Sequence, residues 1–136
     1  KLQLHSLEVR SGEDIEAAFV GMKKARLNAL LTMLDPLTTL HSKRIVDLAV
    51  KNRWPGMYPT RQFVEEGGLM AYGVNIGDLY YRAATYVDKI LKGSNPAELP
   101  VEQPKKFEFI INLKTAKQIG VTMPPNLLAR ATRIIR

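Results

Sequence analysis

The sequence predicts an α/β domain built on an open, mostly parallel sheet flanked by helices. Short apolar runs of strand length alternate with amphipathic stretches of helical periodicity along the chain, a pattern typical of parallel sheets with helical crossovers. One run, residues 28–34, is apolar almost throughout, as is a strand that helices cover on both faces. The 136 residues, 46% of them hydrophobic and 24% charged, suffice for one globular domain with its own core.

Three predicted pairs of strand and helix fill the first half of the chain. The strands are residues 2–9, 28–34 and 54–58, and the helices begin at Ser11, Leu37 and Thr60. Ser11 and Asp14 resemble a capping box, in which side chains bond the free backbone N–H groups of a helix start. We expect the apolar strand at 28–34 to be central in the sheet. The strand at 54–58 is the weakest, because Pro55 cannot donate to a ladder.

Residues 67–93 join a short strand to the longest amphipathic helix. Two glycines end the preceding helix, the strand covers residues 69–72, and Gly73 provides backbone freedom where the strand ends. Asn75 and Asp78 form a second capping-box pattern at the start of the helix. The apolar face of this helix consists of Leu79, Ala83, Val87, Ile90 and Leu91. The sequence therefore predicts a strand, a turn and a helix here.

The last part of the chain begins with a proline-rich connector, residues 94–105, which we expect to be extended and to add nothing to the core. Residues 106–113 alternate in polarity and predict a strand, and residues 115–119 predict one helical turn. A last helix starts at Pro124 and Pro125. Its inward residues are Leu127, Leu128, Ala131, Ile134 and Ile135.

Composition narrows the classes of partner. Twenty basic and 13 acidic residues give a net charge of +7, but the basic residues are scattered and no basic stripe carries interleaved aromatic residues, so we expect a solvated surface and no nucleic-acid partner. Zero cysteines exclude disulfides and thiolate metal sites. No apolar run approaches the roughly 18 residues that span a bilayer, and no signal-peptide pattern stands at the start.

Polar side chains follow three of the predicted parallel strands. If these strands are parallel neighbours, their carboxyl ends meet at one edge of the sheet, where small ligands are bound in such folds. Asp35 offers a carboxylate for an ammonium group and Arg61 a fork for a carboxylate, so the set suits a zwitterion such as an amino acid. The predicted ligand-binding residues are Asp35, Thr38, Tyr58, Thr60, Arg61, Tyr72 and Asn75.

Each of these residues also has a purely structural interpretation. Asp35 before Pro36 is typical of an N-cap followed by the first residue of a helix. Arg61 is placed to pair with Glu65 one helical turn later. Tyrosines at strand ends, such as Tyr58 and Tyr72, are commonly part of the core edge.

Catalytic, metal and cofactor signals are weak. His5 and His41 lie on separate predicted elements without a carboxylate or a second histidine at ligand spacing. The sequence contains no nucleophile elbow, no P-loop and no dinucleotide-binding glycine motif after a strand. An enzyme is therefore not indicated, and we expect neither a metal nor a cofactor.

Two runs of the second half resemble a known family. The runs FVEEGGLMAYGVNIGDLYYRAATYVDKILKG, residues 63–93, and LPVEQPKKFEFIINLKTAKQIGVTMPPNLLARA, residues 99–131, are similar to the C-terminal part of substrate-binding proteins of ABC transporters. The branch is the one that includes tryptophan- and tyrosine-binding members, and the resemblance extends over essentially the whole chain. It implies a non-catalytic, periplasmic or otherwise extracytoplasmic receptor whose two α/β lobes close on a small solute and present it to a membrane permease.

The resemblance also implies a domain organisation. Residues 1–136 would form the C-terminal lobe, of the type I periplasmic-binding-protein kind, incomplete because the first lobe and one strand lie outside the chain. The helix over residues 76–93 would pack on the first lobe, with residues 94–105 as the connector. The turns at Asp35, at residues 58–61 and at Tyr72 would face the cleft between the lobes.

A missing strand would leave unpaired backbone groups between residues 2–9 and 28–34. We therefore expect the isolated chain to pair with another copy through its strands, as a homo-oligomer, or to rearrange its own strands. Two other functions stay open from sequence alone. One is a flavodoxin-like ligand-sensing regulatory domain without a role in transport, and the other is an α/β enzyme, for which no motif argues.

Overall fold

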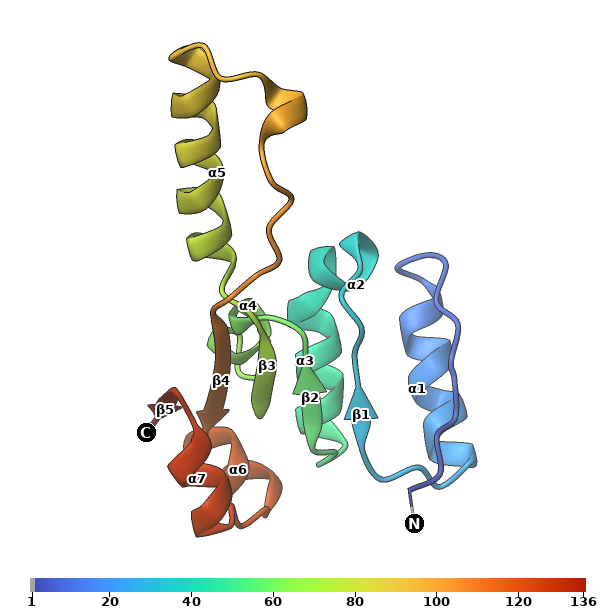
Figure 1. Cartoon of the computed structure of the whole chain (residues 1–136). Coiled ribbons are helices and arrows are strands. Elements are labelled where there is room, and N and C mark those ends of the chain that lie inside the picture. Colours follow the sequence, from blue (N-terminus) through green and yellow to red (C-terminus); the bar gives the residue numbers. More distant parts are fainter. Residues whose placement is uncertain (1) are drawn as a thin grey trace.

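The computed structural model describes residues 2–136, so Lys1 lies outside the described part of the chain. Five strands form one sheet in the order β1-β2-β3-β4-β5, with helices packed against it (Figure 1). The strands are β1 (Leu30–Leu31), β2 (Gly56–Tyr58), β3 (Met70–Val74), β4 (Phe107–Asn112) and β5 (Arg133–Ile135). The helices are α1 (Asp14–Lys24), α2 (Pro36–Leu40), α3 (Ser42–Lys51), α4 (Arg61–Glu65), α5 (Ile76–Leu91), α6 (Leu113–Ile119) and α7 (Pro125–Arg130). The predicted α/β fold with an open, mostly parallel sheet is confirmed.

Three of the four strand pairs are parallel, and only the pair of β3 and β4 is antiparallel among the described strands. The reversal follows from the connection between these two strands. After β3 the chain continues away from the sheet through α5, and residues 94–106 bring it back to the start of β4 (Figure 1). The strand predicted to end before Gly73 continues through it to Val74.

Most of the core lies on one face of the sheet. Apolar side chains of α1, α3 and α4 pack there against inward-facing residues of β2, β3 and β4. This cluster consists of Ile15, Phe19, Ile45, Val46, Ala49, Tyr58, Phe63, Val64, Ala71 and Ile110. Full burial of a large apolar side chain stabilises a fold by about 1.5–3 kcal/mol. The cluster therefore fixes the strands whose carboxyl ends form the site described below.

A second, smaller cluster attaches α6 and its neighbourhood to the sheet. It consists of Leu69, Ile111, Ala116, Ile119 and Met123, with Leu128 and Ala131 packed against it. Ile110 and Ile111 are successive residues of β4 and belong to different clusters, because successive side chains of a strand point to opposite faces.

The predicted first strand is wrong. Residues 2–10 form no strand or helix, and apart from Val9 they are exposed. A strand persists only where a neighbour accepts and donates its backbone hydrogen bonds, and β1 pairs with β2 alone.

The apolar run at residues 28–34 is also not central. Only Leu30 and Leu31 are in a strand, which lies at the edge of the sheet. Leu31 and Met33 are 60% and 71% exposed, so the run predicted to be buried has a free edge and a free face within the described chain.

The predicted last helix is too long. α7 ends at Arg130, and Arg133–Ile135 form β5, which runs parallel to β4. Ile134 and Ile135, interpreted from the sequence as a helical face, instead pair with the ladder beside Ile111 and Asn112. Isoleucine favours strands when a pleated partner is available, and tertiary pairing here overrides the helical spacing.

The start of α1 differs from the predicted capping box. The helix begins at Asp14, whose carboxylate accepts hydrogen bonds from the N–H groups of Arg10 (3.0 Å) and Ser11 (2.8 Å) and from Ser11 Oγ (3.1 Å). These hydrogen bonds, with the backbone N–H of Arg10 contributing most, lower the pKa of Asp14 below its usual value. Asp14 thus ties residues 10 and 11 to the first turn of α1.

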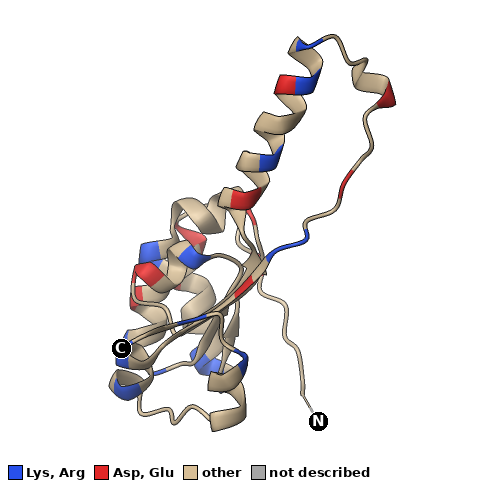
Figure 2. Ribbon diagram, turned by 60° about the vertical axis from the view of Figure 1, so that its left-hand side comes forward, with Lys and Arg blue, Asp and Glu red and all other residues tan. Residues whose placement is uncertain are grey.

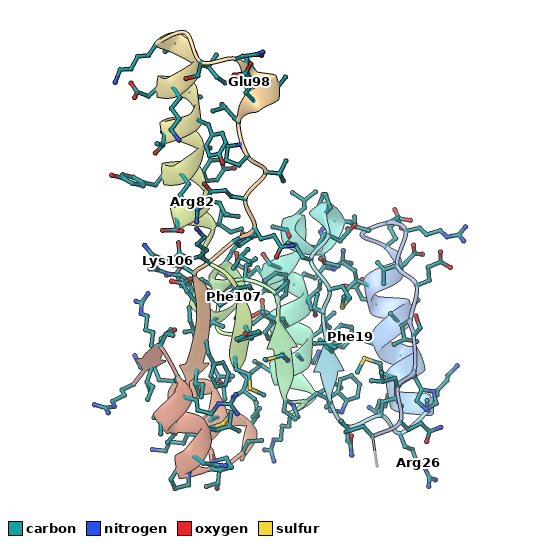
Figure 3. The ribbon with its side chains drawn as sticks, in the orientation of Figure 1. Phe19, Arg26, Arg82, Glu98, Lys106 and Phe107 are labelled. Atoms are coloured by element: carbon teal, nitrogen blue, oxygen red, sulfur yellow. The ribbon has the colours of Figure 1, made fainter. Side chains whose placement is uncertain are left out.

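α5 and residues 92–106 form a projection that we call the arm; the rest of the described chain is the body (Figures 1 and 2). Asn75 caps α5 as predicted, because its Oδ1 accepts the N–H of Asp78 at 2.8 Å. None of the residues of α5, all of which the structure describes, is buried. Two contacts hold the returning chain to the helix. Arg82 of α5, labelled in Figure 3, forms an ion pair with Glu102, and the Tyr86 hydroxyl donates to Pro100 O at 2.6 Å.

Candidate functional site

The turns after β1, β2 and β3 lie at one edge of the sheet, because the three strands are parallel neighbours. Gly73 allows the last two turns to approach each other closely. A Cβ at this position would lie 1.9 Å from Pro59 O, a separation that no side chain tolerates. The polar groups of the three turns therefore share one surface, as expected for a ligand site at the carboxyl ends of parallel strands.

Two adjoining hollows occupy this surface. The first, which we call the polar hollow, has a volume of about 460 Å³ and is open to solvent. It is lined by Leu34, Thr39, Thr60, Arg61, Gln62, Glu65, Val74, Asn75, Ile76, Gly77 and Glu108. Residues from all three turns, from the start of α5 and from β4 thus contribute to one concavity.

The second hollow, which we call the apolar hollow, has a volume of about 620 Å³ and is more open. It is lined by Leu34, Asp35, Pro36, Thr39, Leu40 and Gln62. Leu34, Thr39 and Gln62 line both hollows, so the two are continuous. Their volumes are those of small-molecule sites, but both are open to solvent.

The predicted residues after β1 mainly stabilise their own turn. Asp35 caps α2, with its Oδ1 accepting the N–H of Leu37 at 2.7 Å, which confirms the N-cap interpretation. Thr38 Oγ1 donates toward Met33 O and Asp35 O, at 3.0 Å each, and Thr39 Oγ1 donates to Asp35 O at 2.8 Å. Asp35 lines the apolar hollow and Thr38 lines neither.

The predicted residues after β2 divide between the hollow and the core. Arg61 lines the polar hollow and, as its structural interpretation predicted, pairs with Glu65, with Nε 2.6 Å from Oε1. Thr60 also lines the hollow, and its Oγ1 is buried without a hydrogen-bond partner among the described residues. Tyr58 lies in the core.

Tyr58 is not available as a flat surface for a ligand. Its side chain is 1% exposed and stacks on Phe63 with 5.0 Å between the ring centroids. Burial raises the pKa of its phenol well above the usual value, because the ionised form would be poorly solvated. Side chains alternate between the two faces of a strand, and Tyr58 is on the face of β2 that packs against the core.

Tyr72 is accessible, at 55% exposure, but it lies away from both hollows. Its neighbour Ala71 belongs to the main core, so Tyr72 points to the other face of the sheet. There its ring stacks on Phe107 with 5.9 Å between centroids and meets Phe109 edge-on. The structure therefore brings Thr60, Arg61 and Asn75 together, with Asp35 in the adjoining hollow, and leaves the two tyrosines out.

Three polar residues of the polar hollow, Gln62, Glu65 and Glu108, were not predicted, and Glu108 is the one farthest along the chain from the three turns. It lies in β4 opposite Gly73, and its Oε1 accepts a hydrogen bond from Asn75 Nδ2 at 2.9 Å. The only signal in the sequence was a carboxylate in an alternating strand, which usually means a solvated side chain. Its place in the hollow depends on the antiparallel register between β3 and β4, which brings a distant segment beside the turn at Asn75.

Residues 2–136 contain neither a cluster of metal ligands nor a helix that could span a membrane. No group of three or more potential metal ligands lies together in this part of the chain. Likewise, none of its helices has the length and apolar character required to cross a membrane.

The fold is an open α/β sheet with two hollows at the carboxyl ends of its parallel strands. A family model described as ABC transporter substrate binding protein matches residues 1–135. The chain therefore belongs to the ABC transporter substrate binding protein family. No curated protein matches it significantly.

Solved structures agree with this assignment. The ABC domain from Streptococcus pneumoniae in complex with L-Trp is 25% identical, with a TM-score of 0.88 over 98% of this chain and 45% of that one. A conserved domain protein from Vibrio cholerae O1 biovar eltor is also 25% identical, with a TM-score of 0.83 over 93% of this chain and 42% of that one.

A third structure shares the fold. It is the ligand-free, open form of a substrate binding protein with adhesive properties from Clostridium difficile, 20% identical, with a TM-score of 0.64 over 94% of this chain and 42% of that one. This chain thus spans less than half the length of each of these structures.

Proposed function

We propose that the chain is the ligand-binding C-terminal lobe of the substrate-binding component of an ABC import system. This component captures a small solute, an amino acid or a similar compound, in a cleft between two lobes and delivers it to a membrane permease. It works outside the cytoplasm and catalyses no reaction. The observation that carries the proposal is the pair of solvent-open hollows at three parallel strand ends, in a chain of this family.

The chemistry of the hollows supports an amphipathic solute. Leu34, Pro36 and Leu40 give the apolar hollow a surface for a hydrocarbon or aromatic side chain. Thr60, Arg61 and Asn75 give the polar hollow hydrogen-bonding groups, and the Arg61 guanidinium suits a carboxylate. The neighbouring structure that contains L-Trp supports an amino acid as the class of ligand.

Capture requires a second wall. A solute that contacts both lobes stabilises the closed arrangement over the open one by the free energy of the contacts that exist only when closed. We place the first lobe opposite the hollows and against α5, whose apolar side chains are uncovered in this chain. The 136 residues alone therefore bind solute weakly or not at all.

The test is isothermal titration calorimetry of the complete two-lobe receptor with the twenty amino acids. We expect at least one to bind, and Arg61→Ala to weaken it by roughly tenfold or more, as expected when a hydrogen bond to a charged group is lost. Arg130→Ala is the matched control, because Arg130 is exposed on α7 and lines neither hollow. Equal affinities for wild type, Arg61→Ala and Arg130→Ala would remove Arg61 from the site.

A further inference from the structure

The charges that line the polar hollow are not balanced. Three of its lining side chains are charged, namely Arg61, Glu65 and Glu108. Glu65 pairs with Arg61 at 2.6 Å and also lies 3.6 Å from Arg133. Glu108 forms no ion pair with any lysine, arginine or histidine of residues 2–136. The hollow therefore contains one carboxylate that no cation of the described chain compensates.

Asn75 fixes the position of this carboxylate. Its Oδ1 accepts the N–H of Asp78, which caps α5, and its Nδ2 donates to Glu108 Oε1 at 2.9 Å. Because both ends of the amide are engaged, the side chain of Asn75 is held in one orientation. Its hydrogen bond in turn holds the Glu108 carboxylate in place. Only one carboxylate oxygen is occupied by this contact, and a carboxylate accepts more than one hydrogen bond.

A structural role at the start of α5 does not account for Glu108. A negative charge near a helix N-terminus is favourable, but Asp78 already supplies one in the first turn. Asp78 is in turn paired with Lys106 at 2.6 Å. Both the cap and the charge that this helix start prefers are thus present without Glu108.

We infer that Glu108 is the group of this lobe that recognises a primary ammonium group on the solute. The inference rests on the proposed function and specifies its ligand class as solutes that carry an amine beside an apolar side chain. The carboxylate of Asp35, which the sequence suggested for this role, lies in the apolar hollow and caps α2. Glu108 accepts hydrogen bonds from the ammonium, and Arg61 binds an anionic group of the same solute.

The test compares two solutes that differ only in the amine. Calorimetry of the complete receptor uses L-tryptophan with 3-indolepropionate, and L-leucine with 4-methylpentanoate. We expect wild type to prefer the amine-bearing member of a pair by roughly 10- to 100-fold, as a charge-assisted hydrogen bond allows. In Glu108→Gln the preference falls to about threefold or less, while the affinity for the deamino member is unchanged, because glutamine still accepts the hydrogen bond from Asn75.

Glu65→Gln is the matched control, since Glu65 is an acidic residue of the same hollow that already has cationic partners. We expect it to keep the preference for the amine, whatever it does to overall affinity. A folded Glu108→Gln receptor that keeps the full wild-type preference for the amine-bearing solute would overturn the inference. A wild-type receptor that binds other solutes but no member of either pair would also overturn it. Failure of wild type to bind any amino acid or other solute would overturn the proposed function itself.

Discussion

The body and the arm use similar sequence patterns to different effect. α3 in the body and α5 in the arm are both amphipathic, and α3 buries Ile45, Val46 and Ala49 against the sheet. α5 is the longer helix, yet none of its residues is buried. At its base, the contacts are polar. Asn75 N–H donates to Lys106 O at 3.0 Å, Asn75 Nδ2 donates to Glu108 of β4, and Lys106, labelled in Figure 3, pairs with Asp78 within the arm.

This difference shows what an amphipathic pattern reports. The pattern indicates that one face of a helix packs against an apolar surface. It does not indicate that this surface lies within the same 136 residues. For α3 the partner is the sheet of this chain. For α5 we propose the first lobe, in line with the chain spanning less than half of the structures that it matches.

The largest expected effect is a difference in stability between alanine substitutions of a valine in the body and a valine in the arm. Val64→Ala in α4, a fully buried position, should lower the free energy of unfolding of the chain by about 2–3 kcal/mol, because apolar contacts are lost and a cavity remains. Val87→Ala in α5, where the side chain is 54% exposed, should change it by less than about 0.5 kcal/mol. Urea denaturation followed by circular dichroism measures both, and equal losses would contradict the distinction between body and arm.

The second prediction tests whether α5 packs on the first lobe in the complete receptor. Val87→Asp should leave the unfolding free energy of the 136-residue chain within about 0.5 kcal/mol, because the side chain is in water there. In the complete receptor the same change should cost about 1–2 kcal/mol, since it places a charge in an apolar interface. Thermal unfolding of both proteins checks this, and an unaffected receptor would refute the packing of α5 on the first lobe.

The third prediction concerns the free edge of β1. We propose that the isolated chain self-associates by strand pairing there. The N–H groups of Leu30 and Thr32 donate to Pro55 O and Met57 O on the β2 side, so the backbone of Leu31 between them faces the free edge. Leu31→Lys should weaken this association by roughly tenfold, as charged edge residues do in natural sheets. Val20→Lys, at an exposed apolar site on α1, is the control. Sedimentation equilibrium measures both, and a monomeric wild type at all concentrations would exclude the proposal.

The smallest expected effect is the pH response of α1. The pKa of Asp14 is lowered in the folded chain, so its contribution to stability is fully present above its ordinary value of 3.8 and is lost as the pH falls through the folded value. Asp14→Asn should therefore reduce stability at neutral pH and flatten the loss of stability between about pH 4 and more acid conditions. Urea midpoints measured across this range test it, and parallel curves for both proteins would contradict it.

Local signals were the most predictable part of this molecule. The N-caps at Asp35 and Asn75 follow from short-range chemistry, because their side-chain oxygens accept hydrogen bonds from free N–H groups only two or three residues away. The pair of Arg61 and Glu65 follows from helical spacing in the same way. From α1 to β4 the order of strands and helices was predictable from hydrophobic periodicity, except for the division of one predicted helix into α2 and α3.

Non-local pairing explains what the sequence did not reveal. Residues 2–9 have the composition of a strand but no partner, whereas residues 133–135 have helical spacing and become a strand because β4 is available. Glu108 lines the hollow because β4 pairs with β3 in one particular register, although the whole arm separates these two strands along the chain. That Tyr58 lies in the core could not be predicted, because a strand of three residues is too short for its alternation to show which face is inward.

The direct continuation of β3 into α5 gives the arm mechanical leverage. With 16 residues, α5 is about 24 Å long, so a rotation of about 10° at Asn75 would displace its tip by about 4 Å. Asn75 also lines the polar hollow and orients Glu108. A solute that rotates the backbone at this asparagine by about 10° would thus move the tip of α5 far enough for a neighbouring protein to detect.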